Sequence, residues 1–315
     1  MFSRWFQKKK ILGWSAVKSG RNGLTGATVL APTTAGEKPL VLACATVSDS
    51  GVEPTSLGAM AQQIAADQTS WVLCLDRSEY RTLVVPEPPV QPAEMEQSLR
   101  WALAPMIERP VDEVAMASMT IPTAEAIPNR PQQCYVIVSP HETIARHSTA
   151  FAQARLPLAA IDIPDTAQRN IAALLAKPDE GIGLLRVASQ GVLFTVTYRG
   201  ELYLDRYFED SLLDDSMPDT EGENRAFERI ALQVQRSLDF ISRSFPFISV
   251  DRVLIAPLQR PMAIGEIVAQ NVSVPVRRID LAEVFDFSRT PELADEATQS
   301  RYFLVLGAAL RFNNE

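Results

Sequence analysis

Histidine and cysteine are scarce in this sequence. Its 315 residues include two His and three Cys, with no CxxC spacing. So few nitrogen and sulfur ligands argue against a metal site. Cys44, Cys74 and Cys134 each lie inside an apolar run, and an odd number of such thiols predicts buried, reduced side chains. The sequence also lacks the Gly-x-Ser-x-Gly elbow of α/β-hydrolases and the Walker A loop of P-loop NTPases, so neither class of enzyme is indicated.

Long apolar runs and a surplus of basic residues are missing as well. The longest apolar candidate, 302–310, is far shorter than the roughly 20 residues that span a membrane. Lys18 and Arg21 interrupt the apolar run that a secretory signal would need. The net charge of −8 argues against nucleic acid as the main partner. With 46% hydrophobic residues, the chain is expected to be a cytoplasmic globular protein with two domains.

The sequence does contain a long amphipathic stretch from Thr220 to Phe245. Apolar residues recur there every three or four positions, opposite a face of charged residues and glutamine, which predicts one long helix. Thr220 and Glu223 have the spacing of a capping box, and Pro246 ends the pattern. Residues 250–256 then read as a buried strand. A long helix leading into an apolar strand is typical of a layered α/β domain.

Hydrophobic patterns predict the same order of elements, β-β-β-α-β, in both halves of the chain. The first half has a hairpin over 11–31 with its turn at 20–23, a strand at 39–47, a helix at 56–66, and strands at 71–76 and 80–85. The second half has strands at 181–187, 191–198 and 201–208, then the long helix and its strand. A duplicated two-lobed architecture is therefore expected.

Proline separates the two halves. Pro86, Pro88, Pro89 and Pro92 form a stiff, extended connector, and Pro164 marks a second border. Between these borders the pattern predicts a helix at 93–106, strands at 115–121 and 135–139, a helix at 142–154 and a strand at 157–163. Residues 86–163 are thus expected to form a small inserted α/β subdomain.

Three stretches resemble the FtsA/PilM branch of the actin-like ATPase superfamily. The helix EQSLRW followed by RPVDEV resembles the PilM-type "ELxxALRW" helix and its "P-V-D/E-E" turn. Residues 134–164 resemble the strand, helix and Asp-Ile-Pro ending that close the same subdomain. FERIALQVQRSLDF, at 227–240, resembles the "LxxEIQRSLDY" helix. The basic, aromatic N-terminus before a glycine hairpin is similar to MshI members, which serve assembly of the MSHA type IV pilus.

The resemblance covers nearly the whole chain and implies an α/β, actin-like (ribonuclease-H-like) fold of two lobes. The implied divisions are a basic aromatic tail at 1–10, a first lobe made of 11–85, 164–178 and the C-terminal helix 298–313, an inserted subdomain at 86–163, and a second lobe at 179–297.

Actin-like ATPases hold Mg-ATP with Asp-x-Gly hairpins, and this sequence departs from that pattern. We assign the corresponding positions to Gly13 and Ser15 in the first half and to Gly181 and Gly183 in the second, where no acidic residue stands inside the strand. A plainer role for Gly181 and Gly183 is to relieve crowding at a strand start. Without carboxylates to hold Mg²⁺, hydrolysis has little help, so we expect no cofactor and a pseudo-ATPase.

The resemblance implies a scaffold of pilus assembly that sits at the inner membrane and binds a short cytoplasmic peptide of an inner-membrane assembly protein. Trp101, Pro88 and Pro89 are the candidate partner-binding residues, although a core position for Trp101 is the alternative. A different class of function is an ATP-binding, Mg-dependent ATPase that switches conformation during pilus or secretion-system assembly. A metabolite kinase of the same superfamily would need a catalytic Asp that is not evident.

Charged segments suggest two further contacts. The tail combines Phe2 with six residues suited to an anionic membrane surface, and the alternative is a plain leading segment. These six are Arg4, Trp5, Phe6, Lys8, Lys9 and Lys10. Residues 209–223 are acidic and could attract a cation or a basic partner, although such a run is more often a solvated loop.

Overall fold

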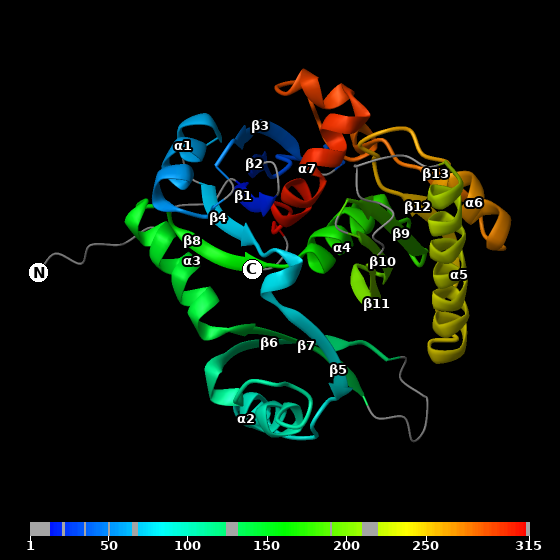
Figure 1. The fold of residues 1–315 in the computed structure, drawn as a ribbon, viewed down its shortest axis with the longest axis horizontal. Helices are drawn as coiled ribbons and strands as arrows, with labels where there is room; N and C mark the ends of the chain where they lie inside the picture. The colour runs from blue at the N-terminus through cyan, green and yellow to red at the C-terminus, as the bar shows by residue number, and fades with distance from the viewer. Residues whose placement is uncertain are drawn as a thin grey trace, which may run out of the picture.

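Two five-stranded sheets with the same strand order form the frame of the molecule. The computed structural model describes residues 13–20, 23–34, 36–49, 51–64, 69–123, 132–189, 191–209 and 220–312. The first sheet has the order β3-β2-β1-β4-β8 and the second β11-β10-β9-β12-β13. In each, the first three strands form an antiparallel meander, and the next two lie parallel to the first strand. Figure 1 shows the two lobes side by side above a smaller unit.

The first lobe contains β1 (Gly13–Gly20), β2 (Gly23–Leu30), β3 (Leu40–Val47), α1 (Pro54–Ile64), β4 (Thr69–Cys74) and β8 (Leu158–Asp162). Apolar residues of α1 pack on one face of this sheet. Leu57, Met60 and Ile64 of α1 are spaced three and four residues apart, and all three are buried, as the helical period requires.

The second lobe contains β9 (Gly181–Ala188), β10 (Gly191–Tyr198), β11 (Glu201–Phe208), α5 (Thr220–Ser244), β12 (Val250–Ile255), α6 (Ile264–Asn271) and β13 (Val276–Arg278). The predicted apolar stripe of α5 is confirmed: Phe227, Ile230, Val234 and Ile241 are buried in the core of this lobe. Every residue of β10 is buried because the strand is covered on both faces.

Two helices connect the lobes by crossing from one to the other. α4 (Pro164–Leu175) follows β8 of the first lobe but packs on β10 and β11 of the second. α7 (Glu296–Ala308) comes after the second lobe but packs on β1, β2 and β4 of the first. The two helices also contact each other, so one apolar core runs through both lobes.

The inserted unit is a three-stranded antiparallel sheet with one covering helix. Its strands β5 (Arg81–Pro86), β7 (Gln133–Pro140) and β6 (Val114–Ile121) lie in that order, and α2 (Pro92–Leu103) covers one face through Leu99 and Leu103. The other face contacts the second lobe, where Tyr135 and Ile121 join its core. In Figure 1 this unit hangs below the two lobes.

Both borders of the insert differ from the predicted 86–163. β5, predicted as the last strand of the first lobe, pairs with β7 of the insert. β8, predicted as its closing strand, pairs with β4 of the first lobe. α3 (His141–Gln153) likewise packs into the first lobe, where Phe151 meets Trp71 with ring centroids 6.3 Å apart. The sheet of the insert therefore spans about residues 81–140, because strand pairing rather than proline position decides which unit a strand joins.

Candidate functional site

A cavity of about 370 Å³ lies between the two lobes. The ends of the two matching hairpins line it, with Lys18, Ser19, Gly20 and Gly23 from the first lobe. The second lobe contributes Arg186, Val187, Ala188, Ser189 and Gly191. The remaining walls come from the turn after β4, from residues 259–262 and from α7.

Glycine is required at one position in each hairpin. Gly23 has a φ of +122°, and a Cβ there would lie 2.1 Å from the carbonyl oxygen of Val47. Gly191 has a φ of +139°, and a Cβ there would lie 2.6 Å from the hydroxyl of Tyr207. Any larger residue would be strained at these two positions, so both hairpins turn tightly at the cavity.

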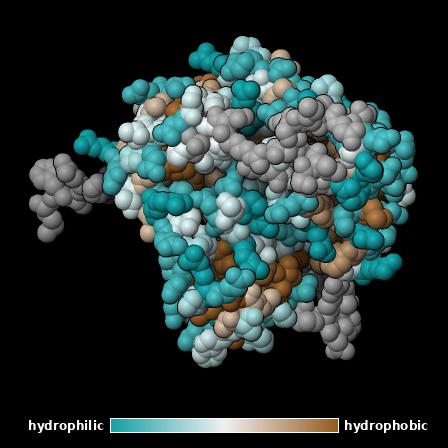
Figure 2. Space-filling model, viewed as in Figure 1, coloured by the Kyte–Doolittle hydropathy of each residue, from teal (hydrophilic) through white to brown (hydrophobic). Residues whose placement is uncertain are grey.

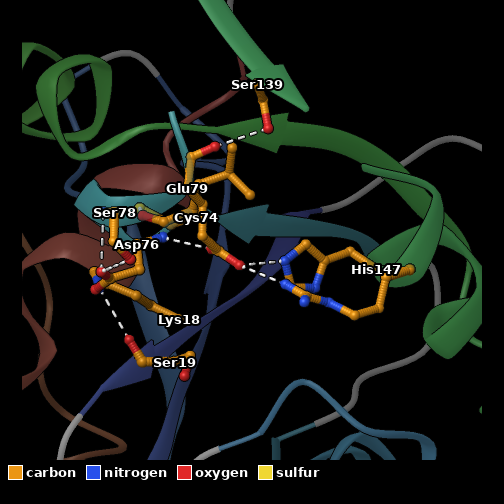
Figure 3. A network of polar contacts seen from close by, with 10 residues as sticks. Lys18, Ser19, Cys74, Asp76, Ser78, Glu79, Ser139 and His147 are labelled. Atoms are coloured by element: carbon orange, nitrogen blue, oxygen red, sulfur yellow. Dashed lines mark hydrogen bonds and ion pairs between the residues drawn. The ribbon is translucent and has the colours of Figure 1, made fainter. Parts of the chain in front are cut away.

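A polar network joins the first hairpin to α3 (Figure 3). Lys18 Nζ lies 3.0 Å from Asp76 Oδ2. Asp76 caps the short 3₁₀ turn Arg77–Glu79, and the Glu79 carboxylate accepts the backbone N–H of Asp76. Glu79 Oε1 also lies 2.7 Å from His147 Nε2. Burial raises the pKa of Asp76, but Lys18 and the donors of Ser78 outweigh it, so the pKa stays below its ordinary value and the carboxylate is ionised.

Two arginines at the cavity lack an ion-pair partner among the described residues. The guanidinium of Arg77 lies 4.8 Å from the ring centroid of Tyr80 and 5.2 Å from that of Tyr207, and its Nη1 is buried without a hydrogen bond. Arg186 projects from β9 beside Leu193 of β10. Burial lowers the pKa of the Arg186 guanidinium, and none of the described carboxylates forms an ion pair with it.

Two further arginines complete a cationic wall. Arg260 Nη2 lies 2.5 Å from Glu223 Oε1, and Arg301 projects from α7 at the exposed rim. Among the residues that the structure describes, five cationic side chains thus line the cavity, against one carboxylate, Asp76. This arrangement favours an anion.

A pair of carboxyl groups lies behind the cavity. Asp165, in the first turn of α4, is buried and accepts a hydrogen bond from the Tyr80 hydroxyl. Burial, followed by the negative charge of Asp165, raises the pKa of Asp205 on β11 to about 7. Neither side chain lines the cavity. No sequence pattern points to this pair, since its members are 40 residues apart and come together only through the packing of α4 on β11.

The four predicted nucleotide-loop positions do not line the cavity, so their assignment is corrected. Gly13 and Gly181 begin β1 and β9, at the ends opposite the hairpin turns. The Ser15 hydroxyl is buried 2.8 Å from that of Thr28, and a Cβ on Gly183 would lie 3.0 Å from Phe194. The plainer interpretation, that Gly181 and Gly183 relieve crowding, agrees with these contacts.

The hairpin ends that do line the cavity lack the carboxylates that would hold Mg²⁺. Residues 18–23 and 188–191 contain no Asp or Glu. Asp76, the one carboxylate among the described residues of the cavity, already forms an ion pair with Lys18. Mg²⁺ prefers carboxylate and phosphate oxygens in a net negative site, and here a lysine stands at the hairpin. Among the described residues, no group of three or more His, Cys, Asp or Glu could hold a metal ion.

The predicted partner-binding residues lie on the insert, away from the cavity lining. Trp101 is on α2 and is 72% exposed, so the alternative of a core position is wrong. Pro89 is exposed and Pro88 half-buried, in the connector between β5 and α2. The predicted membrane-surface residues, 4–10, lie outside the described residues. Within the described part of the chain, no helix is both long and apolar enough to cross a membrane.

Comparison with known proteins gives matches in structure but not in sequence. Searches found no protein-family model and no curated protein that matches the chain. A PilM–PilN type IV pilus biogenesis complex matches with a TM-score of 0.71 and 16% identity, covering 96% of this chain and 98% of that chain. The cytoplasmic domain of EpsL, an inner-membrane component of the type II secretion system of Vibrio cholerae, matches with a TM-score of 0.51 and 12% identity, covering 93% and 97%. The chain therefore has the actin-like, two-lobed α/β fold that its sequence predicts.

Proposed function

We propose that this protein is a scaffold of a type IV pilus or related secretion assembly machinery, of the MSHA type. In this role it lies on the cytoplasmic side of the inner membrane and binds a short cytoplasmic peptide of an inner-membrane assembly protein. The observation that carries the proposal is the end-to-end match to a PilM–PilN complex, which includes the inserted subdomain. The match to the EpsL domain, a part of an inner-membrane component, supports the same setting.

The insert offers the docking surface. Trp101 is the most exposed large apolar residue that the structure describes, and it projects from the solvent side of α2, whose opposite side buries Leu99 and Leu103. Figure 2 shows apolar surface over the three-stranded sheet of the insert, to which the 43% exposed Val84 of β5 belongs. Glu94 is exposed on α2, whereas the exposed Glu96 is paired with Arg100 at 2.9 Å, so a peptide with apolar anchors and a basic residue near Glu94 suits this surface.

Peptide binding by two variants tests the proposal. The probe is the cytoplasmic peptide of the inner-membrane pilus-assembly protein from the same organism, labelled for fluorescence anisotropy. We expect Trp101→Ala to weaken binding at least tenfold, since exposed tryptophans at an interface commonly carry much of its energy. Phe240→Ala, at a 41% exposed aromatic on α5, is the matched control and should bind as the wild type does. Equal affinity of both variants and the wild type would place the docking surface elsewhere.

We also propose that the protein is a pseudo-ATPase. The supporting observation is the absence of acidic residues from residues 18–23 and 188–191. Without a held metal ion, charge that develops on a transferring phosphate is not neutralised. Purified protein should release phosphate from Mg-ATP no faster than the buffer does. A turnover that survives purification and is lost in Arg186→Met would instead favour a working ATPase.

A further inference from the structure

The outward face of α5 has charged residues in an order that is complementary to its own reverse. Seven exposed residues, three or four positions apart, form one stripe along the helix: Glu221, Arg225, Glu228, Leu232, Arg236, Asp239 and Arg243. This spacing places them all on the same side of a helix. On either side of Leu232 the signs are opposite, because each acidic residue has a basic residue at the same distance beyond the leucine.

An antiparallel pair of α5 helices with a two-fold axis at Leu232 would bring these opposite charges together. In such a pair, the residue four positions before the axis faces the residue four positions after it in the second copy. Glu228 therefore faces Arg236, and Arg225 likewise faces Asp239. The residues at the two ends of the stripe match in the same way, and each contact occurs twice because the interface is isologous. A parallel pair would instead place every charge beside its own copy.

The outward face of α5 is open to another molecule. α5 packs inward on β11 and α6, and Figure 1 shows it standing at the edge of the molecule. Leu232, at the centre of the stripe, is 42% exposed. Glu228, Arg236 and Asp239 form no ion pair with another described residue. A solvated helix needs surface charge but no particular order of it, so the mirrored order is the observation that indicates a partner.

The interface would be long, polar and weak. A helix of 25 residues is about 37 Å long, so the contact can extend along its length. Exposed ion pairs contribute little each and are screened by salt, and one leucine from each copy is a small apolar centre. If the proposed function holds, copies bound to partners in one membrane meet at a raised effective concentration, at which a weak contact is sufficient.

From these observations we propose that α5 is a self-association surface, through which two copies of this protein pair antiparallel. Leu232 lies on the two-fold axis, and ion pairs between Glu228 and Arg236 lie on either side of it. The charge order excludes the parallel pair, and the partner is a second copy because the stripe is complementary to itself. This surface belongs to the second lobe and the docking surface to the insert, so either proposal can fail without the other.

Charge reversal tests the pairing, with sedimentation equilibrium of the full chain as the measurement. In low salt the wild type should show a monomer–dimer equilibrium whose Kd rises at least tenfold in high salt. Glu228→Arg should be monomeric because like charges then face each other, and Arg236→Glu should be monomeric for the same reason. An equimolar mixture of these two variants should dimerise, since opposite charges face each other again at both positions. The double variant, with both changes in one chain, should dimerise as the wild type does.

Cross-linking tests the antiparallel register. Leu232→Cys should form covalent dimers with a short bismaleimide, because the two copies of this position meet at the axis. Arg243→Cys is the control and should not, since its two copies would lie about 33 Å apart along the helices.

Three results would overturn the proposal. The first is a wild type that remains monomeric in low salt at every concentration reached. The second is dimerisation that neither single reversal weakens, or single variants that do not associate when mixed. The third is cross-linking of Arg243→Cys as efficient as that of Leu232→Cys, which would mean a parallel or random contact.

Discussion

At the scale of single residues, charge inside the fold sets the response to pH. The pKa of Asp205 lies near 7, against 3.8 for an ordinary Asp, because burial and then Asp165 disfavour its ionised form. Between these two values the folded protein holds a proton that the unfolded chain does not. Stability contributed by this proton is therefore full below about pH 4 and is lost as the pH rises through 7.

Asp205→Asn is expected to remove the fall in the free energy of unfolding that the wild type shows as the pH rises through 7. Asparagine resembles the neutral carboxyl, so the variant should be more stable than the wild type above pH 7, and the difference should shrink toward pH 4. The scale is roughly 1.4 kcal/mol for each pH unit crossed, reduced by partial solvent access. Urea unfolding at pH 5 and pH 8 measures the difference in stability between the variant and the wild type. Asp239→Asn, on the exposed face of α5, is the control. A wild type that gains stability from pH 5 to 8 relative to Asp205→Asn would contradict the prediction.

Single residues were also where the sequence was hardest to interpret. Trp101 is exposed on α2, although a tryptophan on an amphipathic helix is as compatible with a core position, and its role in partner binding stays a prediction. Arg186 was missed, but a signal was present, since it is the one charged residue in the apolar strand GIGLLRVA. Its lack of an ion pair depends on residues from other strands, which no local pattern displays.

At the scale of elements, the contact between α4 and α7 has almost no free space. A Cβ on Gly307 of α7 would lie 2.2 Å from the carbonyl oxygen of Ala167 on α4. Asn170 Nδ2 donates to the Gly307 carbonyl oxygen over 3.0 Å, which fixes the register of the two helices. The pair can approach so closely only because this position lacks a side chain.

Gly307→Ala should therefore destabilise the protein in spite of the better helix propensity of alanine. We expect a loss of about 1–3 kcal/mol in the free energy of unfolding, because the obstructing atoms belong to backbone and α7 must move. Gly58→Ala is the matched control, since Gly58 lies in α1 with nothing within 4 Å of an added Cβ. That variant should gain up to about 1 kcal/mol. Both values come from urea unfolding, and similar signs for the two variants would refute this account of the helix contact.

Most elements followed from the sequence because their causes are local. Periodicity located the long helix α5, and prolines and glycines located many of the turns. Membership of a sheet is not local: β5 and β8 have sequences suited to either unit, and pairing with β7 and β4 decides between them. The direction of the hairpins explains why the nucleotide-loop positions were wrongly placed at the start of β1. The turn at 20–23 was predicted correctly, but the nucleotide loop was assigned to the start of β1, one strand length away.

At the scale of the whole molecule, the insert is not an independent appendage. Tyr135 and Ile121 extend from its sheet into the core of the second lobe, and the Ser139 hydroxyl donates to the backbone carbonyl of Glu79 over 2.8 Å. Arg169 of α4 also contacts Met119 of β6. The insert should therefore unfold together with the lobes.

The three cysteines test this directly, since Cys44 and Cys74 lie in the first sheet and Cys134 in the insert. Burial raises the pKa of all three thiols, that of Cys134 to about 11, so the native protein should react slowly with a thiol-labelling reagent. In increasing urea, all three should become reactive at one midpoint. Variants that retain one cysteine each, with alanine at the others, assign the signals. Reaction of Cys134 at clearly lower urea than Cys74 would mean that the insert opens separately.

The crossing of α4 and α7 between the lobes also has a consequence for biosynthesis. The strands of the first sheet are complete once Asp162 has been translated, but the side chains of its inner face, among them Ala16, Ala27 and Val72, share a core with Phe303 and Leu306 of α7. A nascent chain keeps that face uncovered while the ribosome makes the entire second lobe. The N-terminal lobe is thus translated first, but its core is complete only after α7 has been translated. During synthesis it presents the kind of apolar surface that chaperones bind.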